Sequence, residues 1–129
     1  MTTVNIIGAG RVGRTFLRLL DTQVNGVASR SFDSAKVAVA EVGHGRAFPL
    51  ADLPAADIWL LTVPDTQIAK TAEGIPSTVP PALAVHCSGF HAADVMAALR
   101  SRGWRLASAH PNLSFADPEE AAASFRGTP

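Results

Sequence analysis

The sequence lacks an excess of charge of either sign, a second cysteine and any hydrophobic run long enough to cross a membrane. Its 11 lysines and arginines balance 11 aspartates and glutamates, so no overall field attracts nucleic acid or an anionic membrane. The single cysteine, Cys87, excludes an internal disulfide and, by itself, a zinc site. No apolar stretch approaches the roughly 20 residues of a membrane span. We therefore expect no nucleic-acid or membrane partner, and any bound phosphate must be held by a local site.

Further absences narrow the location and the chemistry. A charged segment followed by an apolar one, as in a secretory signal, is missing because glycines interrupt the first apolar run at once. We therefore expect a cytoplasmic protein. The four histidines show no metal-ligand spacing with acids or with the cysteine, which predicts that there is no metal site. No nucleophile-elbow sequence surrounds Ser88, which argues against a Ser/His/Asp triad.

Strand-length apolar runs alternate with helix-period stretches along the whole chain. This alternation is typical of βαβ units and predicts an α/β fold, with a doubly wound, mostly parallel sheet and helices on both faces. The chain has 129 residues, 47% of them hydrophobic and 17% charged, which suits one globular domain over 1–129. The expected strands are 4–7, 26–29, a weak one at 46–48, the strongly apolar 58–63, 83–87 and 104–109.

Helices are expected between these strands and after the last of them. The helix that follows 26–29 should begin at Ser31 or Asp33, because both side chains suit an N-cap. Asp65 is interpreted as the cap of the helix that follows 58–63, with a catalytic acid as the alternative. The other expected helices are 12–20, about 92–102 with Gly103 at its end, and a short one starting at Asp117.

The first motif that carries chemistry is a glycine loop at 8–13, which matches GxGxxG between an expected strand and an expected helix. Gly8 would allow a tight turn, Gly10 would let a pyrophosphate approach the backbone, and Gly13 would let helix and strand pack closely. Arg11 and Val12 open the helix, whose N–H groups and positive dipole end suit phosphates. The motif predicts a Rossmann-type domain that binds the pyrophosphate of NAD(P). The alternative is a glycine-rich turn in an unrelated α/β fold.

The second motif, Ser29-Arg30-Ser31, follows the second expected strand. NAD-binding domains place an acid here, about 20 residues after the first glycine, to accept the ribose 2′-OH. A guanidinium between two hydroxyls suits the 2′-phosphate of NADP instead, through charge-assisted hydrogen bonds. We therefore predict NADP as the cofactor, with NAD less favoured. The alternative is a solvated arginine at the end of a strand.

Three later expected strands end in residues that could contact a ligand. Val63 and Pro64 end the most apolar run, and ligands of doubly wound sheets bind beyond the carboxyl ends of the strands, so both should flank the cofactor. Ser88 and His110 are the candidate catalytic residues, and Ser88 and Asn112 are candidate cofactor contacts. His86 lies inside its strand and has the alternative of a core histidine, while Cys87 is interpreted as a small buried apolar residue.

In this order, the motifs resemble the N-terminal domain of the 6-phosphogluconate dehydrogenase-like superfamily over nearly the whole chain. The segments 6–13, 29–31 and 61–65 look like its cofactor-binding segments. The more specific pair, 86–89 and 110–111, is similar to a bacterial branch of NADP-binding oxidoreductases with an uncharacterised C-terminal helical domain. Pro111-Asn112 is similar to the loop that faces nicotinamide in pyrroline-5-carboxylate reductases.

The resemblance implies hydride transfer between NAD(P)H and a small-molecule substrate. It implies that the three glycines bind pyrophosphate, that 29–31 bind the adenosine ribose, that Val63 and Pro64 flank the cofactor, and that Ser88 loosely matches a serine contacting substrate or nicotinamide. The family's helical domain closes the substrate site and forms the dimer, and residues 1–129 do not contain it. We expect the parent protein to continue into such a domain and to form a homodimer. A non-catalytic dinucleotide-binding or sensor module is the alternative.

Overall fold

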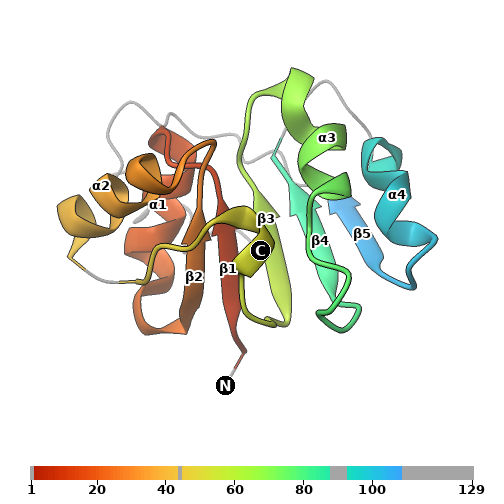
Figure 1. Cartoon of the computed structure of the whole chain (residues 1–129), viewed down its shortest axis with the longest axis horizontal. Helices are drawn as coiled ribbons and strands as arrows, with labels where there is room; N and C mark the ends of the chain where they lie inside the picture. The colour runs from red at the N-terminus through yellow and green to blue at the C-terminus, as the bar shows by residue number, and fades with distance from the viewer. Residues whose placement is uncertain (1, 44, 88–92, 109–129) are drawn as a thin grey trace.

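A sheet of five parallel strands organises residues 2–43, 45–87 and 93–108, the part of the chain that the computed structural model describes (Figure 1). The spatial order is β2-β1-β3-β4-β5, so the chain runs from β1 to one side and then crosses to the other. Such a reversal leaves a crevice beyond the carboxyl ends of β1 and β3. The strands are β1 (Val4–Ile7), β2 (Val24–Ala28), β3 (Ile58–Leu61), β4 (Leu83–His86) and β5 (Arg105–Ser108).

Helices cover both faces of this sheet, which confirms the doubly wound α/β fold expected from the sequence. On one face α1 (Arg11–Leu20) and α2 (Phe32–Val42) contact each other and pack on β1 and β2. On the other face lie α3 (Ile68–Glu73) and α4 (Ala97–Arg100), which also contact each other. Figure 1 shows the second pair over β4 and β5. None of the described helices is long and apolar enough to span a bilayer.

The ends of α2 show how the local sequence sets the helix. Ser31 is the N-cap, and its hydroxyl accepts a hydrogen bond from the Ser34 N–H at 3.1 Å. Gly43 closes the other end with φ 93°, a left-handed conformation that glycine adopts without strain. Its N–H donates to the Val39 carbonyl at 2.8 Å. Of the two caps considered from the sequence, the structure selects Ser31.

The structure corrects two of the expected elements. The segment 46–48 is not a strand, because it forms a single bridge, between Ala47 and Val27, and Pro49 follows with no N–H to extend the ladder. The helix expected at about 92–102 is split into a 3₁₀ turn, Ala93–Met96, and the short α4. Gly103 still closes this region as expected, with φ 86°. The expected helix at Asp117 lies outside the described residues.

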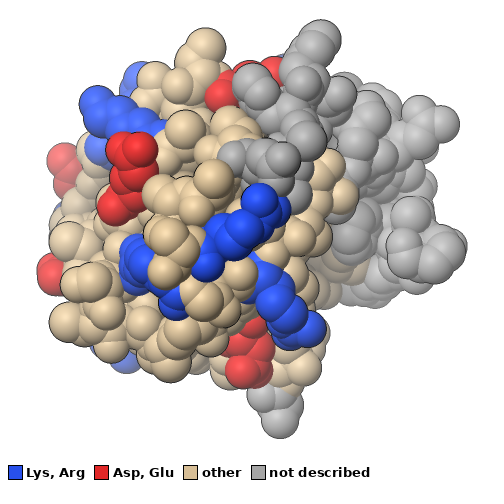
Figure 2. Space-filling model, turned by 90° about the vertical axis from the view of Figure 1, so that its right-hand side faces the viewer, with Lys and Arg blue, Asp and Glu red and all other residues tan. Residues whose placement is uncertain are grey.

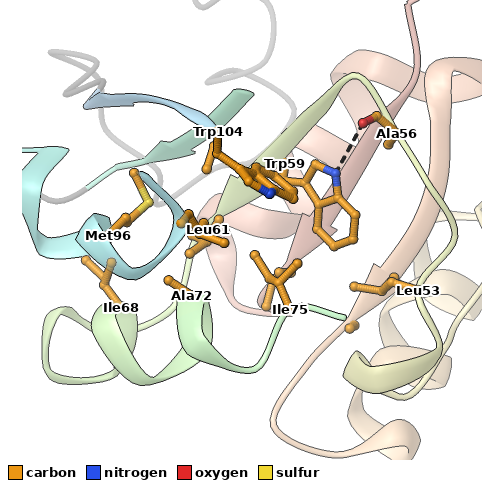
Figure 3. Packing of buried hydrophobic residues seen from close by; sticks show 13 residues of the cluster. Leu53, Ala56, Trp59, Leu61, Ile68, Ala72, Ile75, Met96 and Trp104 are labelled. Atoms are coloured by element: carbon orange, nitrogen blue, oxygen red, sulfur yellow. Dashed lines mark hydrogen bonds between the residues drawn. The ribbon is translucent and has the colours of Figure 1, made fainter. Parts of the chain in front are cut away.

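Successive buried residues of a strand point to opposite faces of the sheet and therefore belong to two separate core clusters. Ile6 and Leu60 pack toward α1, whereas Ile7, Trp59 and Leu61 pack toward α3 and α4. Trp59 is fully buried, and its indole N–H donates to the Ala56 carbonyl at 3.2 Å. Its ring meets that of Trp104 edge-on, with centroids 5.5 Å apart (Figure 3). This cluster attaches α3 and α4 to the sheet.

The tryptophan pair provides a test of the core. Trp59→Phe should lower the free energy of unfolding by about 1 kcal/mol more than Trp104→Phe, because only the Trp59 indole N–H has a hydrogen-bond acceptor among the described residues. Both changes remove a similar volume from the same cluster. Urea unfolding followed by circular dichroism measures the difference. Equal losses would show that the Ala56 hydrogen bond contributes nothing.

Candidate functional site

A cavity of about 1210 Å³ opens where the sheet reverses its strand order. Small-molecule sites commonly enclose roughly 300–1,000 Å³, so this cavity has room for a ligand as large as a dinucleotide. In Figure 1, α2 and α3 lie on either side of the strands that lead to it. Its lining includes seven residues singled out from the sequence: Gly8, Gly10, Ser29, Arg30, Ser31, Val63 and Pro64.

The glycine loop forms one wall, and its three glycines meet different surroundings. Gly8 has φ 120°, and its N–H donates to the Ala28 carbonyl at 2.7 Å. Gly13 packs so tightly on the Gly8 carbonyl that any side-chain carbon there would overlap it. Beside Gly10, in contrast, there is open space within 4 Å of the position a Cβ would take. Gly10 also accepts the first helical hydrogen bond of α1, from the Arg14 N–H at 3.0 Å.

The loop after β2 forms the facing wall. Ser29 is half-buried, while Arg30 and Ser31 are exposed. The Ser31 hydroxyl is occupied by the cap, because it accepts from the Ser34 N–H and donates to the Ser34 Oγ at 2.9 Å. Arg30 has no ion pair among the described residues. Asp33, in the first turn of α2, also lines the cavity and pairs with Lys36 at 3.4 Å.

Residues 1–111 match the family model of the Rossmann-like domain. The chain belongs to the Rossmann-like domain family. No curated protein matches it significantly. Protein TM1727 from Thermotoga maritima is 29% identical, with TM-score 0.66, covering 88% of this chain and 41% of that one. BF3122 from Bacteroides fragilis, named as an NADP oxidoreductase, is 24% identical with TM-score 0.58, covering 73% of this chain and 38% of that one.

A third solved structure, a pyrroline-5-carboxylate reductase from Coxiella burnetii, is 16% identical with TM-score 0.62, covering 80% of this chain and 41% of that chain. The Rossmann-like domain therefore spans less than half the length of each of these three proteins. The matches confirm the Rossmann-type fold that the motifs predict, and this fold is shared with structures that are named as oxidoreductases.

The residues to which sequence reasoning gave no individual role lie directly after β3 and along α3. The Thr62 hydroxyl donates to the Ile7 carbonyl at 3.0 Å and lies 3.4 Å from the Gly8 carbonyl oxygen, so it ties β3 to the glycine loop. The signal was a threonine at the end of the most apolar run. One polar face of α3 and its preceding turn also lines the cavity, with the helical spacing i, i+3, i+4, i+7: Gln67, Lys70, Thr71 and Gly74.

Other predicted positions take different places in this Rossmann-like domain. Arg11, Val12 and Gly13 begin α1 beside the cavity without lining it. Asp65 does not cap α3 with its side chain, since the N–H groups of Gln67 and Ile68 bond to backbone carbonyls. That prediction was wrong because a 3₁₀ turn satisfies these donors. Three predicted site residues lie outside the described residues: Ser88, His110 and Asn112.

The end of β4 carries His86 and Cys87. His86 is fully buried between Leu61 and Ser108 of the neighbouring strands, which fits the alternative of a core histidine. Cys87 is half-buried and packs on the cluster beneath α1. Burial raises the pKa of the Cys87 thiol to about 11, so it is protonated and a poor nucleophile near pH 7. No group of three potential ligands gathers among the described residues to hold a metal ion.

The two glycines after Gly8 should respond oppositely to substitution. Gly13→Ala should lower the free energy of unfolding by at least about 2 kcal/mol, because the new methyl group overlaps the Gly8 carbonyl. Gly10→Ala should cost no more than about 1 kcal/mol, since its methyl group enters open space. It should nevertheless weaken the binding of a dinucleotide that approaches this backbone. Urea unfolding and titration with NADPH separate the two effects, and equal destabilisation would contradict the geometry.

Proposed function

We propose that this Rossmann-like domain binds NADP(H) and serves an oxidoreductase that transfers hydride between nicotinamide and a small-molecule substrate. The observation that carries the proposal is the cavity, bounded by a glycine loop on one side and by Arg30 on the other. No acid lies at 29–31, where an NAD-binding domain would place one. The site is therefore suited to a dinucleotide with an additional phosphate.

The pyrophosphate would lie against the glycine loop. The backbone at Gly10 is open to the cavity, and the first N–H groups of α1 lack intrahelical acceptors. Arg11, Val12 and Gly13 supply these donors, and the helix dipole adds a partial positive charge. No acid in the first turn of α1 opposes an anion there.

The adenosine half would lie against the loop 29–31 and the start of α2. Ser31 is occupied by its cap, so Arg30 is the main donor left for a 2′-phosphate, with Ser29 beside it. Phe32 and Val37 line the same cavity while 43% and 58% exposed, so a bound adenine could cover apolar surface. Val63 and Pro64 would flank the cofactor from β3.

The names of the similar structures support the assignment, since one is an NADP oxidoreductase and one is a reductase. Because this chain spans less than half of each, we propose that a helical domain completes the substrate site and the homodimer. Asn112 and Ser88 would contact the nicotinamide half, and Ser88 and His110 would act in catalysis. We place the protein in the cytoplasm.

Cofactor preference tests the proposal directly. The chain should bind NADPH about tenfold more tightly than NADH at low salt, because Arg30 forms a charge-assisted hydrogen bond with the 2′-phosphate. Arg30→Ala should remove most of that preference and leave the Kd for NADH nearly unchanged. Fluorescence titration measures both, with Arg105→Ala as the control for lost charge. Equal Kd values for NADPH and NADH in the native chain would show that Arg30 contacts solvent and not the 2′-phosphate.

Catalysis needs a separate test, in the complete protein. Ser88→Ala and His110→Ala should each lower NADPH oxidation at least tenfold with a panel of small carbonyl and imine compounds, while the Kd for NADPH changes less than about twofold. Such a split is expected if both groups face the reacting atoms. Loss of NADPH binding in step with turnover would mark them as structural. Binding without turnover in the unaltered protein would favour the sensor module.

A further inference from the structure

One wall of the cavity belongs to α3, and its orientation is set by the core. Ile68 and Ala72 are fully buried and Ile75 nearly so, and Figure 3 shows all three directed into the cluster that contains Leu61, Met96 and Trp59. The remaining face must turn away from that cluster. The residues of this face that line the cavity are Gln67, Lys70, Thr71 and Gly74. The helix therefore cannot rotate to remove these side chains from the cavity without losing its packing.

The charges around the cavity do not cancel. Four charged residues line it: Arg14, Arg30, Asp33 and Lys70. Arg14 is paired with Glu41 at 2.8 Å, and Asp33 is paired with Lys36. Arg30 and Lys70 have no acidic partner among the described residues. Two cations thus remain unneutralised, one on the loop after β2 and one on α3.

The position of Lys70 separates it from the pyrophosphate site. The glycine loop and Thr62 meet at the carboxyl ends of β1 and β3, where α1 begins. Lys70 is six residues beyond Pro64, after a complete 3₁₀ turn, so α3 has already moved away from those strand ends. The same wall ends at Gly74, where the Leu50 side chain packs against the glycine and also lines the cavity. Lys70 therefore borders the half of the cavity that remains for adenosine and its ribose.

We propose that Lys70 is a second specificity-determining cation for the 2′-phosphate of NADP(H), acting from α3 while Arg30 acts from the opposite wall. This inference rests on the proposed function. A lysine ammonium is a compact charge on a flexible stem, so it can approach a phosphate that the planar Arg30 guanidinium already contacts. A phosphate between two cations gains attraction from both, whereas the ribose 2′-OH of NAD gains little from either. The expected result is selectivity shared between two elements far apart in the sequence.

The experiment compares Lys70→Met with the native chain for two pairs of ligands. NADPH and adenosine 2′,5′-bisphosphate should bind about fivefold more weakly to the variant, which corresponds to one exposed charge contact. NADH and adenosine 5′-monophosphate, which lack the 2′-phosphate, should stay within about twofold. Raising the salt concentration should reduce the difference, because screening weakens an exposed contact. Thermal unfolding shows whether the variant retains its fold.

The control is Arg105→Met, which removes the same charge from β5, the edge strand farthest from β2. That strand lies on the side of the molecule shown in Figure 2, where basic side chains gather. The control should bind all four ligands like the native chain. In the double variant with Arg30→Ala, the two losses should not add, because both cations act on one phosphate.

The outcomes separate the inference from the proposed function. An equal loss for NADPH and NADH in Lys70→Met would place the lysine on the pyrophosphate and overturn the inference. Unchanged binding of NADPH, or a loss matched by Arg105→Met, would overturn it as well. A native chain that binds neither dinucleotide would refute the proposed function itself. A preference of the native chain for NADPH over NADH that is lost in Arg30→Ala but fully retained in Lys70→Met would keep that function and reject Lys70.

Discussion

The close packing of Gly13 on the Gly8 carbonyl is the constraint on which the site depends. It brings the start of α1 directly over the end of β1, beside the cavity that Gly8 and Gly10 line. Thr62 completes the arrangement, because its hydroxyl bonds to the Ile7 carbonyl and lies near the Gly8 carbonyl. A side chain at 13 would push the helix away and open this junction. The other walls can face a ligand only because the glycine loop is held in this position.

The opposite walls depend on the sheet and its two cores. Since β1 lies between β2 and β3, the loop after β2 and the helix after β3 face one another across its carboxyl end. The Trp59 cluster attaches α3 to one face of the sheet, while Phe16 and Leu17 attach α1 to the other. Rigid elements on both sides hold polar groups in place more precisely than mobile loops would. The cavity therefore combines a rigid frame with a few polar and charged side chains.

Much of this frame could be predicted from the residues. The glycine loop, the strands that became β1 to β5 and the two helices α1 and α2 follow from local patterns of apolar and capping residues. The prediction of a strand at 46–48 was wrong because a strand must form a ladder with a neighbour, and Pro49 limits this ladder to one bridge. The prediction that Asp65 caps the next helix was wrong because backbone carbonyls of a 3₁₀ turn accept the hydrogen bonds from the N–H groups that its carboxylate was expected to cap. Both errors concern competition between partners, which a local pattern cannot resolve.

The sequence by itself determined the α/β class, the glycine loop and the cationic loop after β2, because turn geometry, helix capping and strand burial act over a few neighbouring residues. Only the tertiary structure decided that Lys70 and Thr71 share a cavity with Arg30, and that Thr62 clamps the glycine loop. Their proximity depends on the strand order, which places residues about 40 positions apart on facing walls. Turns and helix caps depend on hydrogen bonds between neighbouring residues, whereas the crevice forms only where the strand order reverses between β1 and β3.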